Sequence, residues 1–303
     1  MLLFYRKNCE YALSNAYYFS RGESRNAYDF LGSHRIYEEN GKYGYSFVLY
    51  NKNAVRAYVV GDFNDGRRIL MERIGDGIWY AAYESRISIE GGFYEYVVEY
   101  RDNSVHRCYD PFSNVSFSDD GKAFSTVRNE NSFDWSDKKY MSVRKNRGQA
   151  LRKSINIYKV KMHNGMNYRE LSHFLASEAL KLGFTHVKIE GVRESADGSA
   201  FSACFTPSSR YGSSDDFSYL VNTMHSLSVG VIAELFPCGK ALSRSDINTR
   251  EDMSLFLSSA FFWIRNYHVD GIYFCAKKEF FSERLKRAVS EEINDSSIIV
   301  EVG

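Results

Sequence analysis

The 303-residue sequence lacks an excess of charge of either sign. Its 39 Lys and Arg residues balance 38 Asp and Glu residues, which gives a formal net charge of +1. A chain this close to neutrality has no broad electrostatic field to attract nucleic acid or anionic lipid, so neither is expected as a partner.

Long apolar runs are also missing. No run approaches the ~20 residues that a membrane-spanning helix needs. The apolar start before Arg6 and Lys7 is too short for a signal peptide. The sequence therefore predicts a cytoplasmic protein that is not held in a membrane. It has no internal repeat and no low-complexity tract.

Cysteine is sparse and irregularly placed. The five residues form an odd count without a Cys-x-x-Cys pair, so their spacing supports neither a zinc site nor a disulfide framework. Reduced thiols in a cytosol are the simplest interpretation, and no metal or cofactor is expected. The five positions are Cys9, Cys108, Cys204, Cys238 and Cys275.

The residues that are present indicate a globular protein with two parts. Hydrophobic residues make up 44% and charged residues 25% of the chain, as in a protein with a hydrophobic core, and the length suits two domains. In the first half, short β-prone runs alternate with turn signals rich in Gly, Asn and Asp, which favours a small antiparallel β-sandwich. The runs are Tyr43–Tyr50, Ala54–Val60, Gly77–Tyr83 and Phe93–Tyr100.

From about residue 154 the pattern changes to strands that alternate with helices, which predicts a parallel sheet. Residues 168–182 form one expected helix, with Asn167 as its N-cap and Gly183 just after its end. Ser213–Asp216 begin another helix as a capping box. The expected strands are Ile155–Lys161, Phe184–Ile189, Gly230–Phe236, Val269–Phe274 and Ser297–Glu301.

Residues 267–277 read Tyr-His-Val-Asp-Gly-Ile-Tyr-Phe-Cys-Ala-Lys. This segment resembles the one around the catalytic nucleophile in glycogen branching enzymes, which belong to glycoside hydrolase family 13 of the α-amylase superfamily. The family pattern there is Asp-Gly, an apolar residue, Arg, an apolar residue and Asp-Ala. Further segments resemble the same family in the expected order. They are Phe19–His34, Gly61–Asn64, Tyr94–Tyr96, Asp110–Phe112, Asn156–Val160, Leu182–Val187 and Thr206–Gly212.

The resemblance implies a multidomain fold. After a lead-in at residues 1–30, it places a β-sandwich like a family-48 carbohydrate-binding module at residues 31–128. A linker at residues 129–153, whose basic run we interpret as solvated, leads to an incomplete (β/α)8 barrel at residues 154–303, with its first five strands. Because the closing strands are absent, edge strands and an apolar interior are expected to be exposed. The resemblance thus describes a degenerate and truncated branching enzyme.

The resemblance also implies where the catalytic groups stand. Retaining enzymes that act on glucans use two carboxylates about 5–5.5 Å apart, one as nucleophile and one as acid/base. Cys275 takes the nucleophile position, Glu301 the acid/base position, and Tyr273 replaces the family Arg. Glu234 and Asp270 stand at substrate-binding positions. For Cys275, a small packed hydrophobe is a simpler interpretation than a reactive thiol.

The sandwich raises a separate question of sugar binding. Its loop Gly61–Gly66 resembles the family loop Gly-Asp-Phe-Asn-Gly-Trp but lacks the Trp. Since aromatic rings stack on the apolar faces of sugars, Trp79, Tyr80 and Tyr83 are the remaining candidates to bind an α-glucan such as glycogen or starch. The alternation along Ile78–Tyr83 also allows Trp79 to be a core residue.

Three functions remain open. The replaced nucleophile and Arg favour a catalytically inactive, glucan-associated pseudoenzyme of carbohydrate metabolism. Glu301 supports the alternative of an active branching enzyme, or of one half of a split enzyme that a second polypeptide completes. The third alternative is a non-catalytic interaction module or gene remnant, in which a protein partner docks on the open edge of the barrel.

Overall fold

The computed structural model describes residues 2–117, 123–129, 133–147, 155–163, 165–195, 202–235, 249–274, 279–292 and 298–302. The chain forms two compact units, neither of which is continuous in sequence. The first unit comprises Met1–Glu130, Ser195–Thr206 and Cys238–Ser259. The second unit comprises Asn131–Glu194, Pro207–Pro237 and Ala260–Gly303.

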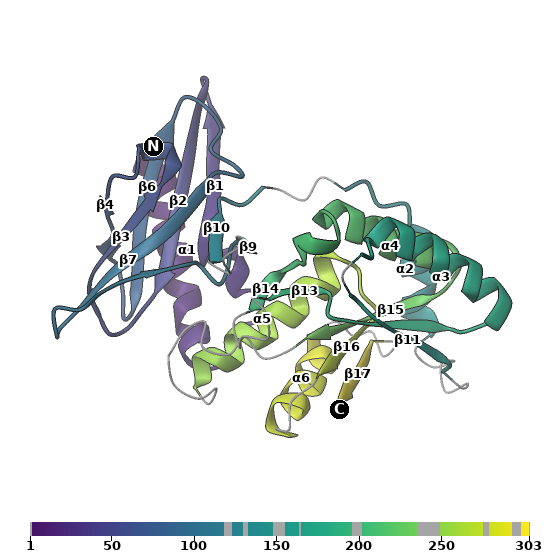
Figure 1. Ribbon diagram of the computed structural model, residues 1–303. Coiled ribbons are helices and arrows are strands. Elements are labelled where there is room, and N and C mark those ends of the chain that lie inside the picture. The colour runs from purple at the N-terminus through teal and green to yellow at the C-terminus, as the bar shows by residue number, and fades with distance from the viewer. Residues whose placement is uncertain are drawn as a thin grey trace. The chain divides into compact units, whose positions relative to one another are not determined.

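Two antiparallel sheets make up most of the first unit (Figure 1). One sheet has the strand order β1-β2-β6-β5, and the other has the order β4-β3-β7-β10-β9 with β8 paired to β7. The predicted β-sandwich is confirmed, and each of its four predicted runs matches a strand, except that Gly77 precedes β6. The strands are β1 (Gly32–Glu39), β2 (Lys42–Tyr50), β3 (Ala54–Gly61), β4 (Ile69–Leu70), β5 (Glu72–Arg73), β6 (Ile78–Ser85), β7 (Phe93–Tyr100), β8 (Val105–Cys108), β9 (Asn114–Phe117) and β10 (Ala123–Thr126).

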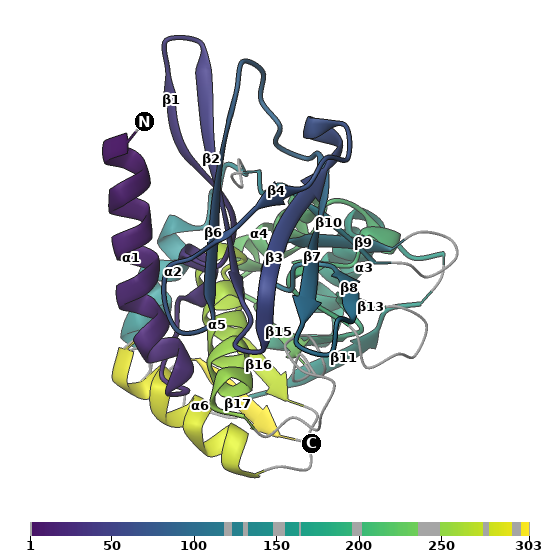
Figure 2. The same cartoon turned by 90° about the vertical axis from the view of Figure 1, so that its left-hand side faces the viewer.

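Alternate residues of these strands fill the core between the two sheets. Trp79 of β6 and Tyr96 of β7 are buried there, because successive side chains of a strand point to opposite faces. Helix α1 (Leu2–Ser20) runs along the other face of the first sheet (Figure 2). Its Tyr5 packs edge-on against Tyr80, with 4.9 Å between the ring centroids. The predicted lead-in therefore contains a helix that shields the sandwich.

Five parallel strands form the main sheet of the second unit, in the order β11-β12-β15-β16-β17. This confirms the predicted partial barrel and its five strands. Helices α3 and α4 lie side by side (Figure 1). From residue 138 on, where the stretches Ser195–Thr206 and Cys238–Ser259 belong to the first unit, the described elements are α2 (Lys138–Arg147), β11 (Ile157–Lys161), α3 (Tyr168–Leu182), β12 (His186–Glu190), β13 (Arg193–Ser195), β14 (Ser202–Pro207), α4 (Ser214–Ser226), β15 (Gly230–Leu235), α5 (Arg250–Asn266), β16 (Gly271–Phe274), α6 (Glu279–Glu292) and β17 (Ile299–Val302). Short 3₁₀ turns lie at Ala27–Asp29, Asp62–Asn64 and Ser209–Tyr211.

The predicted caps define the ends of two helices. The side chain of Asn167 accepts a hydrogen bond from the N–H of Glu170 at 2.8 Å, which satisfies a donor of the first turn of α3. Gly183 follows α3 with a φ of +64°, a left-handed conformation that glycine adopts at little cost. Ser213 and Asp216 form the expected capping box of α4.

The two faces of the parallel sheet differ in character. Residues paired on adjacent parallel strands share a face, so Ile189, Ala233 and Ile272 lie on one side, and all three are fully buried. The other side carries Glu234 and Tyr273, which are also paired. Polar side chains thus gather on one face of the sheet, near the C-terminal ends of its strands.

Two interpretations of the sequence are wrong in the structure. The basic run is not a purely solvated linker, since part of it forms α2 and Arg144 within that helix is only 6% exposed, held beside the carboxylate of Asp270. The cysteines are not all reduced thiols, because Cys204 is disulfide-bonded. None of the described helices is long and apolar enough to cross a membrane.

Candidate functional site

Three residues singled out in the sequence come together near the C-terminal ends of the parallel strands. Glu234 of β15 is level with Tyr273 of β16, and Tyr273 is level with Glu301 of β17. These strand ends form the active-site face of (β/α) barrels. The predicted nucleophile position, Cys275, lies outside the described residues, and only the backbone of Glu301 is described. We call Glu234, Tyr273 and Glu301 the strand-end row.

Glu234 is a nearly buried carboxyl group, 8% exposed. Its Oε2 accepts a hydrogen bond from the N–H of Gly191 at 2.9 Å. Burial raises the pKa of Glu234 and outweighs the opposing bond from Gly191, while the charge of Glu190 raises the pKa further. This carboxyl group therefore keeps its proton to a higher pH than an exposed glutamate does.

A lysine supplies the positive charge beside this row. The Nζ of Lys188 lies 3.9 Å from the centroid of the Tyr273 ring, a cation–π contact. Lys188 is 8% exposed. Level with it on β11, Lys159 forms an ion pair with Glu190, with 2.6 Å between Nζ and Oε1. An aromatic ring covered by an ammonium group therefore stands at the position where the resemblance places an Arg.

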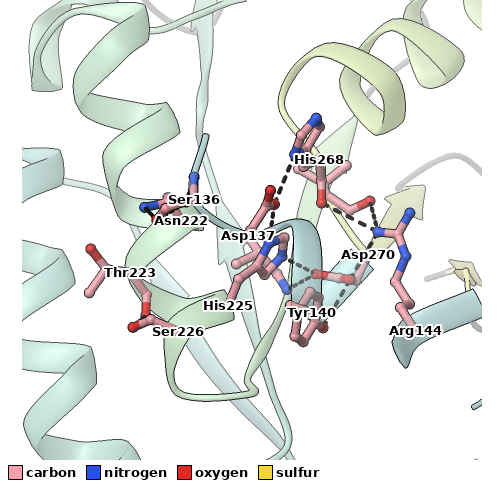
Figure 3. A network of polar contacts seen from close by, with 12 residues as sticks. Ser136, Asp137, Tyr140, Arg144, Asn222, Thr223, His225, Ser226, His268 and Asp270 are labelled. Atoms are coloured by element: carbon pink, nitrogen blue, oxygen red, sulfur yellow. Dashed lines mark hydrogen bonds and ion pairs between the residues drawn. The ribbon is translucent and has the colours of Figure 1, made fainter. Parts of the chain in front are cut away.

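A second group of polar side chains lies at the opposite, N-terminal end of the strands (Figure 3). Asp270 directly precedes β16 and is 1% exposed. Its Oδ1 accepts hydrogen bonds from Arg144 and Tyr140, each at 3.0 Å. Its Oδ2 accepts the N–H of Val231 at 2.7 Å and lies 2.9 Å from Nε2 of His225. One carboxylate thus links α2, α4 and the starts of two strands.

His225, at the end of α4, lies between two carboxylates. Its Nδ1 is 2.7 Å from Oδ2 of Asp137, and its Nε2 is 2.9 Å from Oδ2 of Asp270. Burial opposes the charged imidazole, but the hydrogen bonds to these two carboxylates outweigh it and raise the pKa of His225. Burial alone would raise the pKa of Asp137 and of Asp270. The hydrogen bonds to histidine outweigh burial, so the pKa of each carboxyl group is lowered.

Aromatic rings hold both histidines of this network in place. Tyr140 stacks on His225 with 4.0 Å between ring centroids and 16° between planes. Trp135 stacks on His268 with 3.9 Å and 27°. His268 has a φ of +53°, which is uncommon for a residue other than glycine. Its Nδ1 lies 2.8 Å from Asp137, so the network fixes the turn that leads into β16.

This placement corrects the predicted substrate-binding role of Asp270. A side chain that is 1% exposed and has both oxygens engaged within the protein presents nothing to a glucan. The network around Asp270 therefore has a structural role at the N-terminal ends of the strands, and we call it the junction. Among the residues that the structure describes, no group of three or more His, Cys, Asp or Glu side chains could hold a metal ion.

The aromatic candidates of the sandwich lie in its core or against it. Trp79 is 4% exposed, and its indole N–H donates to the carbonyl of Asn51 at 2.9 Å. Tyr80 is 1% exposed beneath α1. Tyr83 is half-buried, and its hydroxyl donates to the carbonyl of Phe63 at 2.9 Å. Trp79 and Tyr80 therefore lack the open ring face that stacking on a sugar requires, which corrects their predicted role.

A different aromatic surface of the sandwich escaped the sequence analysis. Phe93 of β7 is 51% exposed and packs against Phe124 of β10, with 5.6 Å between ring centroids. Glu95, on the same face of β7, pairs with Arg107 of β8. The alternation along β7 contains the signal, because burying Tyr94 turns residues 93 and 95 outward. We call these four outward residues the Phe93 surface.

Comparison with known proteins identifies relatives of both parts of the chain. Residues 30–113 match the family model of carbohydrate-binding module 48, the isoamylase N-terminal domain. The catalytic module of SpuA, a glycogen-degrading pneumococcal virulence factor, superposes with a TM-score of 0.67 at 15% identity over 90% of this chain and 50% of that one. A pullulanase from Paenibacillus barengoltzii complexed with maltotriose gives 0.63 at 16% identity, over 89% and 52%. At these identities the likeness shows the fold.

Curated relatives are more similar in sequence. The 1,4-alpha-glucan branching enzyme GlgB of Deinococcus radiodurans is 32% identical over 285 residues, which is 80% of this chain and 40% of the relative. The enzyme of the same name from Aquifex aeolicus is 30% identical over 305 residues, 85% of this chain and 47% of the relative. The chain therefore spans less than half the length of these relatives.

Proposed function

From the premise that this chain is a branching-enzyme-like protein of glycoside hydrolase family 13, we propose that it is a glucan-associated protein of glycogen metabolism without branching activity of its own. The proposal has two parts, the absence of catalysis and the retention of glucan binding. Each part depends on a different unit of the chain.

The strand-end row carries the first part. Tyr273 stands at the position of the family Arg, and Cys275, two residues further, stands at that of the nucleophilic Asp. A retaining mechanism needs a nucleophile and an acid/base on opposite sides of the scissile bond. Glu301 retains the acid/base position, but removing one member of a catalytic set commonly lowers the rate by a factor of ~10⁴–10⁶.

The junction around Asp270 supports the same conclusion. Asp270 and His268 both belong to the motif that resembles the family, and both side chains form hydrogen bonds within the protein. These positions hold β16 against β15 without contacting substrate. A chain can therefore keep them for folding while the residues at the other end of β16 change.

The first unit carries the second part. The match to carbohydrate-binding module 48 covers most of the sandwich, and the Phe93 surface offers an exposed ring beside an ion pair. Sugars bind proteins by stacking on aromatic rings while their hydroxyls bond to polar groups beside the ring. Phe93 is therefore the residue that we expect to contact an α-glucan most directly.

Electrophoresis through a native gel that contains glycogen tests this binding. We expect the full chain to be retarded, and Phe93→Ala to weaken the apparent affinity roughly tenfold, about 1.4 kcal/mol, through loss of the stacking ring. Ile87→Ala, a change at another exposed apolar residue of the same unit, is the matched control and should migrate like the parent chain.

The possible outcomes separate the two claims. A parent chain that migrates unchanged in glycogen would show that the protein does not associate with this glucan. Retarded parent and Phe93→Ala proteins with equal affinities would leave glucan association intact and refute its assignment to the Phe93 surface.

A further inference from the structure

Residues 133–147, which we call the docked segment, are held on the second unit by polar and aromatic contacts. Trp135 stacks on His268, and Ser136 exchanges hydrogen bonds with Asn222 at 2.9–3.2 Å. The remaining contacts come from three side chains that point into the network of Figure 3. They are Asp137, Tyr140 and Arg144.

The centre of these contacts is the imidazole of His225. Both ring nitrogens lie within 2.9 Å of a carboxylate oxygen, Nδ1 at Asp137 and Nε2 at Asp270. Because an ionised carboxylate only accepts hydrogen bonds, both nitrogens must carry a proton for both contacts to be favourable. The geometry therefore selects the imidazolium form of His225, with one positive charge shared between two negative ones.

We infer that His225 is a pH-sensitive switch, which ties the docked segment to the parallel sheet while its imidazole is doubly protonated and releases the segment when it loses one proton. Neutral imidazole keeps a single N–H, so one of the two carboxylates would face a lone pair in a buried site. That repulsion lies between α4 and the docked segment, or between α4 and the start of β16.

The two segments that contact His225 contribute charged or titratable groups. The docked segment contributes Asp137, Tyr140 and Arg144, and the turn before β16 contributes His268 and Asp270. With His225 charged, His225 and Arg144 supply positive charge beside the carboxylates of Asp137 and Asp270, and His268 also lies against Asp137.

The sheet itself adds one histidine near this network. Burial lowers the pKa of His186 on β12, although the charge of Asp270 opposes that effect. Burial thus makes His186 harder to protonate than an exposed histidine. The loss of one proton from His225 removes one positive charge from between the carboxylates of Asp137 and Asp270.

The direction of the pH effect follows from the raised pKa of His225. In the released state the imidazole titrates near its usual value of about 6.5, and in the docked state it titrates higher. Docking is therefore fully favoured below about pH 6.5 and is lost as the pH rises through the docked-state value. Between the two, the equilibrium for release increases about tenfold per pH unit.

Nitrogen NMR of the histidine side chains tests the protonation state directly. At pH 7.5 we expect both nitrogens of His225 to have imidazolium shifts, because both face carboxylate oxygens. Assignment uses the signal lost in His225→Gln, or through-bond connection to the His225 backbone if that variant does not fold. A neutral His225 at pH 7.5 would overturn the inference.

Hydrogen exchange of the full chain from pH 6 to 9.5, corrected for intrinsic exchange rates, tests release. Peptides within residues 133–147 should lose at least tenfold in protection as the pH rises, whereas peptides of α3 should keep theirs. His173→Gln, the matched control, should preserve the transition, and His225→Gln should abolish it. Protection of the docked segment that does not depend on pH, or that falls together with that of α3, would refute a local switch.

Discussion

At the scale of single residues, Asp270 illustrates what the sequence can and cannot predict. Its motif identified the strand and its place in the sheet, because Asp-Gly followed by apolar residues is a local pattern. Its chemical role depends on Arg144, which is 126 positions away, and on His225, which is 45 positions away. No local pattern contains those contacts, so the sequence suggested a substrate contact where the structure has a buried junction.

The junction leads to a prediction for Asp270→Asn, which keeps the shape of the side chain and removes its charge. His225 and Arg144 would then remain buried with one carboxylate fewer. Breaking a buried ion pair in this way costs about 3–5 kcal/mol. Denaturant unfolding followed by circular dichroism should show this loss in the free energy of unfolding.

Asp215→Asn is the control for that measurement, since Asp215 is exposed in the first turn of α4. It should change stability by about 0.5 kcal/mol or less. Equal unfolding free energies for Asp270→Asn and the parent chain would contradict a stabilising role for the junction.

At the scale of elements, local signals predicted some helices and not others. The ends of α3 and the start of α4 follow from caps that lie in the sequence itself. Helix α2 has the sequence KKYMSVRKNR, which has no continuous apolar stripe. It is held by Tyr140 and Arg144, whose partners are distant in the sequence. The sequence pattern of α2 does not predict a helix, and α2 is recognised only from its tertiary contacts in the structure.

Helix α4 allows a direct test of a local signal. Replacing Ser213 by Ala removes the side-chain oxygen that accepts the N–H of Asp216 at 3.1 Å, so one donor of the first turn loses its partner. We expect a loss of about 1 kcal/mol in the free energy of unfolding, measured by denaturant titration. Ser177→Ala, at an exposed position within α3, should instead be neutral or slightly stabilising, because Ala has the higher helix propensity. Similar losses from both changes would argue against the capping box.

At the scale of the whole molecule, the sequence predicted the layers of the fold but not the composition of its two units. The first unit includes the start of α5, far from the sandwich in sequence. Ser254 of α5 donates to the carbonyl of Phe19 at 2.8 Å, and Ser258 accepts the N–H of Ala27 at 2.9 Å. Serines within a helix give no sequence signal for partners more than 200 residues away, so these contacts could only be found in the structure.

In the chain as a whole, the strands of the fold are present, whereas residues expected to carry the chemistry are replaced. The five parallel strands and the network around Asp270 form the scaffold of the second unit. The strand-end row combines Glu234 and Glu301 with Tyr273, and Cys275 follows on the same segment. We therefore propose that the scaffold is kept while the branching reaction is lost.

The most direct test of that claim is a branching assay with amylose. The purified full chain is incubated with amylose, and new α-1,6 branches are measured by the iodine spectrum and by chain lengths after enzymatic debranching. The branching enzyme of Deinococcus radiodurans serves as the positive control. We predict an unchanged iodine spectrum and no short chains from this protein. New branches formed by the parent chain, beyond those of a heat-inactivated sample, would contradict this prediction.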